Sequence, residues 1–75
     1  MAIRVTLDRV LAERGMRGRD LARLVGITEA HLSLLRNGKV KGMRFETLSA
    51  LCLHLDCQPG DLLAWEPGED GEGGA

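Results

Sequence analysis

Residues 16–38 read MRGRDLARLVGITEAHLSLLRNG and carry two helical patterns joined by a very short turn. Apolar residues recur at helical spacing over about 18–25 and again over about 29–36. Gly26 can adopt the left-handed conformation that ends a helix, and Thr28 can cap the next one. Because the turn between the patterns is so short, the second helix must cross the first steeply. The apolar positions are Leu21, Ala22, Leu24 and Val25 in the first pattern, and Leu32, Leu35 and partly Ala30 in the second.

Two helices that cross in this way form a helix-turn-helix, whose second helix is offered to the major groove of DNA. The stretch resembles the Cro/Xre-type, or phage-repressor-like, DNA-binding domain. The resemblance covers roughly residues 5–64, and the last two helices of the small five-helix members resemble residues 45–52 (FETLSALC) and 55–63 (LDCQPGDLL). It implies an all-α, compact five-helix bundle that binds double-stranded DNA. The matching residues are Leu21-Ala22, Gly26-Ile27-Thr28, Leu32-Ser33, Leu35 and Asn37-Gly38.

The composition also favours helices over a sheet. Hydrophobic residues make up 44% of the chain, yet Phe45 and Trp65 are its only aromatic residues. The core must therefore be aliphatic, whereas a sheet would call for β-branched and aromatic side chains. Residues 1–5 are β-prone and are expected to form either a frayed arm or a strand that pairs with a second copy. The five expected helices cover about residues 7–14, 18–25, 29–36, 45–55 and 59–64.

Local signals set the ends of these helices. Thr6 is predicted to cap the first helix, and Gly15 to stop it. Pro59 suits the first position of the last helix, where Asp61 favours the positive end of the helix dipole. The apolar face of the fourth helix is predicted to consist of Phe45, Leu48, Leu51, Cys52 and Leu55.

The charge is distributed unevenly along the chain. The formal net charge is -1, but residues 66–75 (EPGEDGEGGA) carry four acidic residues and no basic one. Residues 1–65 therefore form a mildly basic domain, which suits contact with phosphates. The Gly-rich acidic tail has nothing to bury and is expected to be disordered.

The resemblance implies which residues meet DNA. The outward side of the helix over about 29–36 would face base edges, and the residues around it would hold phosphates. His31 can donate to guanine or phosphate, Glu29 can accept from cytosine, and Ala30 can touch a thymine methyl group. The expected base or groove contacts are Glu29, Ala30, His31 and Ser33. The expected phosphate contacts are Arg17, Arg19, Arg36, Asn37, Lys39, Lys41 and Arg44.

The sequence gives no sign of catalysis or of a cofactor. No nucleophile and base pair, metal-ligand set or phosphate-binding loop is recognisable, so we expect no enzyme, cofactor or small-molecule ligand. Cys52, Cys57, His31 and His54 match no common zinc spacing and are assigned to different elements. The cysteines are therefore expected to be buried free thiols. No apolar run is long enough to span a membrane and no leader pattern is present, so a cytoplasmic protein is expected.

Several apolar residues lack an obvious internal partner. Ile3, Val5, Leu34, Leu53 and Trp65 belong to this group. Exposed apolar area of this kind marks interfaces, so we expect a homodimer that uses the N-terminal arm, the last helix and Trp65. The alternative is that Trp65 folds back onto its own bundle.

Two functions remain open at this point. The first is a sequence-specific transcription regulator that binds an operator as a dimer. The second is an adaptor or antitoxin-like protein-interaction module that keeps the fold with weak or no DNA binding, which the outward Leu34 and the acidic tail favour. Salt-dependent binding to random duplex DNA separates them.

Overall fold

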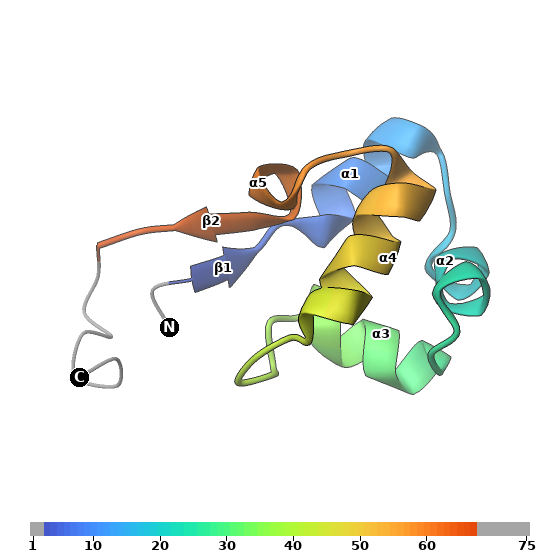
Figure 1. Ribbon diagram of the computed structural model, residues 1–75, viewed down its shortest axis with the longest axis horizontal. Coiled ribbons are helices and arrows are strands. Elements are labelled where there is room, and N and C mark those ends of the chain that lie inside the picture. Colours follow the sequence, from blue (N-terminus) through green and yellow to red (C-terminus); the bar gives the residue numbers. More distant parts are fainter. Residues whose placement is uncertain (1–2, 68–75) are drawn as a thin grey trace.

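Every helix that the apolar spacing predicts is present in the computed structural model, which describes residues 3–67 (Figure 1). The bounds of the first four helices are confirmed, and the fifth is shorter than expected. Helix α4 crosses the middle of the molecule, with its beginning near α3 and its end near α1 and α5 (Figure 1). In chain order the elements are β1 (Ile3–Val5), α1 (Leu7–Arg14), α2 (Gly18–Val25), α3 (Glu29–Arg36), α4 (Phe45–Leu55), α5 (Pro59–Leu62) and β2 (Leu63–Trp65).

The core is aliphatic, as the shortage of aromatic residues predicts. Each helix contributes at least one buried side chain, and no polar or charged residue within 3–67 is buried. Burial of this apolar area is the main driving force for bringing the five helices together. The buried residues are Leu7, Val10, Leu11, Leu21, Ala22, Leu32, Leu35, Leu51, Leu55 and Leu62.

The turn between α2 and α3 forms as its residues predict. Gly26 has a φ of 87°, in the left-handed region, and its amide donates to the Ala22 carbonyl at 2.8 Å. The Thr28 hydroxyl then accepts a hydrogen bond from the His31 amide at 2.9 Å and so caps α3. These two contacts end one helix and begin the next within a short turn, and they fix how α3 leaves α2.

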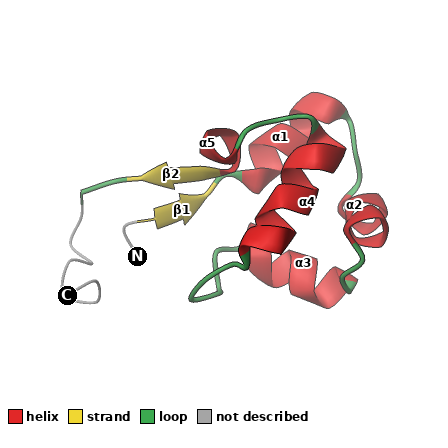
Figure 2. Ribbon diagram, viewed as in Figure 1, coloured by secondary structure: helices red, strands yellow, loops and turns green. Residues whose placement is uncertain are grey.

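Strands β1 and β2, from opposite ends of the described chain, pair in a short antiparallel sheet (Figure 2). Ile3 pairs with Trp65, and Val5 pairs with Leu63. The all-α prediction is therefore only roughly right, because β1 finds its partner strand within the same chain. The last helix was predicted to reach residue 64, but from Leu63 the backbone is extended and belongs to β2.

Thr6 occupies the N-cap position of α1 as predicted, but its side chain makes no cap bond. Its hydroxyl donates to the Asp61 carbonyl at 2.8 Å and its amide donates to the Leu62 carbonyl at 2.8 Å. The residue therefore ties the start of α1 to α5.

Some predicted core positions are exposed. Phe45 is 86% exposed at the first position of α4, although the helical spacing placed it on the apolar face. A helix end projects beyond the elements that cover its middle, and so its first apolar residue finds nothing to pack against. Leu24 on α2 and Ala30 on α3 are also exposed, contrary to their predicted contact with the core.

The described residues contain no helix that is both long and apolar enough to cross a lipid bilayer. Of the acidic tail that was predicted to be disordered, Glu66 and Pro67 are described, and both are exposed outside any helix or strand. The prediction for residues 68–75 lies outside the described residues.

Candidate nucleic-acid interface

Helix α3 divides cleanly into a core face and a solvent face. Leu32 and Leu35 are buried against the other helices and hold α3 in place. The side chains predicted to meet bases are all exposed, and they are Glu29, Ala30, His31 and Ser33. Because Ala30 does not pack on the core, its methyl group is available at the same surface. Leu34 is exposed as well.

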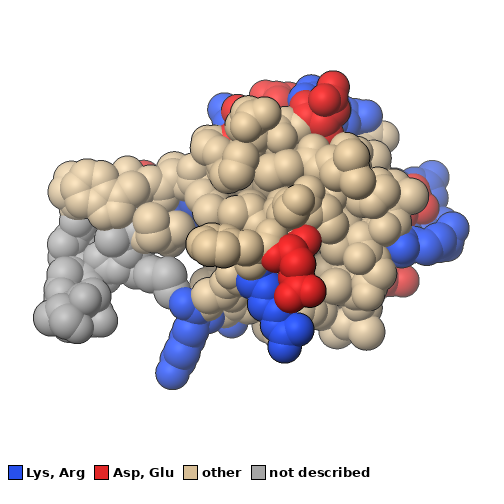
Figure 3. Space-filling model, in the orientation of Figure 1, with Lys and Arg blue, Asp and Glu red and all other residues tan. Residues whose placement is uncertain are grey.

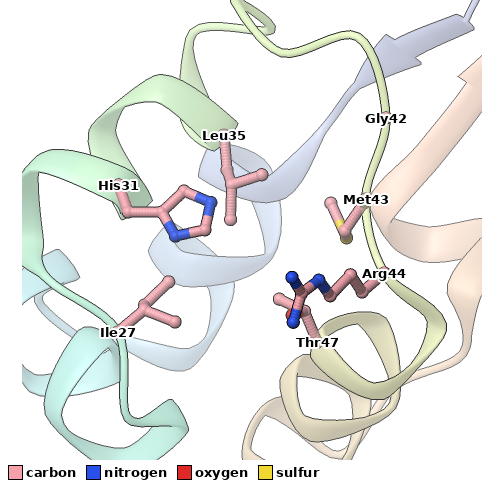
Figure 4. Close-up of a pocket in the computed structure, with 7 residues that line it drawn as sticks. All are labelled: Ile27, His31, Leu35, Gly42, Met43, Arg44 and Thr47. Atoms are coloured by element: carbon pink, nitrogen blue, oxygen red, sulfur yellow. The ribbon is translucent and has the colours of Figure 1, made fainter.

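A hollow lies between the solvent face of α3 and the beginning of α4. It measures about 420 Å³, and we refer to it as the α3–α4 hollow. His31 from α3 and Arg44 from the opposite wall both point into it (Figure 4). The hollow is lined by Ile27, His31, Leu35, Gly42, Met43, Arg44 and Thr47.

The polar groups of this hollow suit an anion or the edge of a base. Arg44 supplies several N–H donors, His31 can donate from its ring, and Thr47 adds a hydroxyl group. Arg44 is also the N-cap of α4 and makes no side-chain cap bond, so the positive end of the α4 dipole opens toward this region. Sequence reasoning missed Thr47, although its position three residues after Arg44 at the start of a predicted helix places the two on one face.

The segment that follows α3 carries several exposed basic residues. The chain turns at Gly38, whose φ is 68°, and the Lys39 amide donates to the Leu34 carbonyl at 2.9 Å. Lys39, Lys41 and Arg44 are exposed along the segment that follows. Figure 3 shows basic side chains projecting at the lower edge of the view, around the loop between α3 and α4.

A second basic group lies at α2. Arg17 and Arg19 are exposed at its beginning, and basic side chains project over α2 in Figure 3. Arg17 occupies the N-cap position of α2 without a side-chain cap bond. Because both side chains are exposed, their guanidinium groups are accessible to a ligand.

Arg36 is arranged differently from the other predicted phosphate contacts. Its Nε donates to Oδ1 of Asp8 on α1, so an acidic side chain already opposes its charge. The guanidinium also covers the first residue of α2, because a Cβ built on Gly18 would lie 2.5 Å from Nη1 of Arg36. The structure thus directs Arg36 toward α1 and α2 rather than toward the α3–α4 hollow.

Asn37 and Ser33 contact each other at the end of α3. The Asn37 side-chain amide donates to the Ser33 hydroxyl at 3.5 Å, which is at the long limit for a hydrogen bond. Both side chains are exposed, and such a weak contact leaves both open to a partner.

Comparison with known protein families identifies the domain that carries this surface. The model of the Cro/C1-type HTH DNA-binding domain matches residues 6–68. The chain belongs to the Cro/C1-type helix-turn-helix family. This finding confirms the resemblance that residues 16–38 indicate.

Two related proteins agree with this assignment. The chain is 50% identical over 70 residues to the uncharacterized HTH-type transcriptional regulator YozG of Bacillus subtilis (strain 168), which covers 93% of this chain and 83% of that protein. The fold is similar to that in the crystal structure of the transcriptional regulator VanUg, with a TM-score of 0.70 and 28% identity. That similarity covers 91% of this chain and 92% of the VanUg chain.

The residues predicted to form a dimer interface are only partly brought together. Ile3, Val5, Leu63 and Trp65 are register partners on one face of the β1–β2 sheet, and Trp65 is 66% exposed. The Trp65 side chain is thus largely exposed, although its backbone pairs with Ile3 of the same chain. Leu53 is 74% exposed, but it lies on α4, apart from this sheet.

An apolar groove of about 210 Å³ continues from that sheet toward the start of α4. Ile3 and Val5 form one side of it, and the exposed Phe45 lies on another. We call it the sheet groove. Its apolar lining consists of Ile3, Val5, Val40, Met43, Phe45, Leu48 and Leu63.

The two cysteines are free thiols, but they are half-buried rather than buried as predicted. Within residues 3–67, no group of three or more His, Cys, Asp or Glu side chains is arranged to hold a metal ion. His31 lies at the α3–α4 hollow and His54 on α4, so the histidines and cysteines do not converge on a common site.

Proposed function

We propose that this chain is a sequence-specific transcription regulator that binds an operator as a homodimer, with α3 in the major groove. The observation that carries the proposal is the exposed face of α3, on which His31 lies opposite Arg44 across the α3–α4 hollow. The family match supports DNA binding, and the names of YozG and VanUg as transcriptional regulators support the regulatory role.

The first turns of α3 are proposed to read the bases. His31 lies in the first turn of α3, after the Thr28 cap, and can donate to guanine, while Glu29 can accept from the amino group of cytosine. Ala30 is exposed and can contact a thymine methyl group. Ser33 lies further along the helix, where a phosphate is the more natural partner.

The basic residues on either side of α3 are proposed to hold the phosphates. Arg17 and Arg19 would engage one strand from the start of α2, and Lys39, Lys41 and Arg44 would engage the other from the α3–α4 side. Asn37 can add a side-chain amide at the end of α3. Arg36 is left out of this set, because its guanidinium is paired with Asp8.

Two copies are needed for tight binding. One helix-turn-helix unit buries roughly 600–1,000 Å² on DNA, which seldom gives strong specific binding alone. We propose that a second copy covers the sheet groove, because Phe45 and Trp65 each expose most of a side chain that can bury ~150–250 Å². The sheet lies on the side of the molecule where α3 ends, so this contact leaves the beginning of α3 free for DNA (Figure 1).

Sedimentation at tens of micromolar tests the dimer. The intact chain is expected at twice the mass of 8.2 kDa, and Trp65→Ala or Phe45→Ala is expected to shift it toward the monomer. Leu53→Ala shows whether the interface extends over α4. A monomer in every case, with or without these substitutions, would contradict the dimer.

Selection of bound sequences from random duplex DNA tests the function itself. We expect two related half-sites in inverted orientation, separated by about one helical turn. A single unpaired site would contradict the dimeric binding mode, and the absence of any enriched sequence would contradict operator recognition.

The protein-interaction module remains the second candidate, because Leu34 is 46% exposed on the very face proposed to meet DNA. Such a module would bind random duplex DNA weakly and with little dependence on salt. Measurement of that binding at two salt concentrations distinguishes the candidates.

A further inference from the structure

The end of α4 brings two thiols together. Asp56 follows the helix with a φ of 52° and a ψ of 57°, in the left-handed region. Its amide donates to the Leu53 carbonyl at 3.4 Å, and the Cys57 amide donates to the Cys52 carbonyl at 3.1 Å. These two bonds form a Schellman motif, in which the side chains of the two outer residues usually touch. Here the outer residues are Cys52 and Cys57.

The electrostatics of Cys57 agree with this proximity. The pKa of the Cys57 thiol is raised above its usual value, first by burial and then by the proximity of Cys52 and Asp61, and Arg14 acts in the opposite direction. Both thiols are free and half-buried, so a small reagent can reach them.

This juxtaposition favours a disulfide. Such a bond needs the two Cα atoms within roughly 4.4–6.8 Å of each other. A direct backbone hydrogen bond between the same two residues holds their main chains close, and a Schellman motif brings the side chains of these two positions together. No third metal-binding side chain joins them within the described residues, so the pair is not arranged as a metal site.

We propose that Cys52 and Cys57 form a reversible dithiol–disulfide pair that peroxides oxidise. One thiolate attacks the O–O bond of the peroxide and becomes a sulfenic acid, and the displaced hydroxide takes up a proton to become water. The second thiolate attacks the sulfenic sulfur, forms the S–S bond and releases a second water molecule. With hydrogen peroxide, the two thiols together lose two protons and two electrons, and one peroxide yields two waters.

The inference does not depend on the proposed function. Cys52, the nearer of the two cysteines, lies eight residues after Arg44, or about 12 Å along the axis of α4. The disulfide would restrict the connection between α4 and α5, where Arg14 also donates to the carbonyls of Leu55 and Asp56. It would leave the α3–α4 hollow untouched, so we expect DNA affinity to stay within about twofold on oxidation, a change of ~0.4 kcal/mol or less.

Treatment of the full chain with hydrogen peroxide tests the pair. Trypsin cuts last after Arg44, so both cysteines lie on the peptide that spans residues 45–75. We expect this peptide to lose two hydrogens without joining another peptide, and a dithiol reductant to restore them. A peptide that gains oxygen atoms at a single sulfur, or that links to a second chain, would overturn the proposal.

Two single variants test the resolving step. Cys57→Ser and Cys52→Ser are each expected to accumulate a sulfenic acid that dimedone traps, whereas in the unaltered chain the second thiol resolves it to the disulfide. Equal trapping in the unaltered chain and in both variants would overturn the proposal. Far-ultraviolet circular dichroism confirms folding of each variant, and the mass experiment on the unaltered chain remains decisive if either variant fails to fold.

Discussion

The two ends of helix α4 are built in opposite ways. At its beginning, Arg44 makes no side-chain cap bond, Phe45 is largely exposed, and the α3–α4 hollow opens beside them. At its end, the carbonyls of Leu55 and Asp56 accept hydrogen bonds from Arg14 at 2.7 Å and 3.0 Å. The Schellman motif satisfies two further carbonyls there.

The contrast indicates where a partner is needed. The amides at the start of α4 and the exposed Phe45 side chain are hydrated in the free domain, and both can gain a partner on binding. The closed end of α4 is already complete within the chain. Substitutions at the open end should therefore change binding with little effect on folding, and substitutions at the closed end should do the reverse.

The largest effect is expected from the open end. Replacement of Lys39, Lys41 and Arg44 together by Gln should weaken binding to all DNA sequences alike, because phosphates carry no sequence information. The slope of log affinity against log salt should fall by up to about 0.9 for each lost phosphate contact. Titration of random and selected duplexes at several salt concentrations measures the slope, and urea unfolding serves as the folding control. An unchanged slope would mean that this segment faces solvent in the complex.

The closed end should respond in stability instead. Arg14→Ala leaves the carbonyls of Leu55 and Asp56 without their charged donor and should lower the free energy of unfolding by about 1–3 kcal/mol. Arg23→Ala, at an exposed position on α2, removes the same charge and is the matched control. If both variants weaken DNA binding equally and unfold alike, the division between the two ends is wrong.

The helices were predictable because their signals are local. Gly26, Thr28 and Pro59 act within a few residues of the helix ends that they define, and the structure confirms each of them. The pairing of β1 with β2 was not predictable, because it joins opposite ends of the chain and depends on where α5 finishes. The exposure of Phe45 was missed for a related reason, since helical periodicity does not reveal which turn lies beyond the neighbouring elements.

The candidate site was predictable to a similar degree. The outward face of α3 follows from its two buried leucines, so the exposure of His31 and Ser33 could be foreseen. The opposition of His31 and Arg44 across a hollow depends on how the loop after α3 folds, and the sequence does not specify it. The pairing of Arg36 with Asp8 likewise needs the relative placement of α1 and α3.

The next prediction refines the open end to a single base. His31→Ala should reduce discrimination at one position of the selected site by about 1–3 kcal/mol, because the imidazole is proposed to reach a base edge. Affinity for random DNA should change much less. Binding to a panel of single-base variants of the selected site provides the measurement. Equal losses on specific and random DNA would make His31 a phosphate contact.

The smallest effect concerns Arg36, a predicted phosphate contact whose charge is already paired with Asp8. Exposed ion pairs contribute roughly 0.2–1 kcal/mol, so Arg36→Gln alone should change stability little and DNA affinity hardly at all.

Gly18 makes the ion pair between Arg36 and Asp8 testable, because a Cβ at residue 18 would collide with the Arg36 guanidinium. Gly18→Ala in an Arg36→Gln background should stabilise the domain by about 0.4–1 kcal/mol, since alanine lowers the entropy of the unfolded chain. In the unaltered chain, the same substitution must displace Arg36 from Asp8, and we expect that gain to be lost. Urea unfolding of the four proteins measures the difference, and an equal gain in both backgrounds would show that Arg36 is free to turn toward DNA.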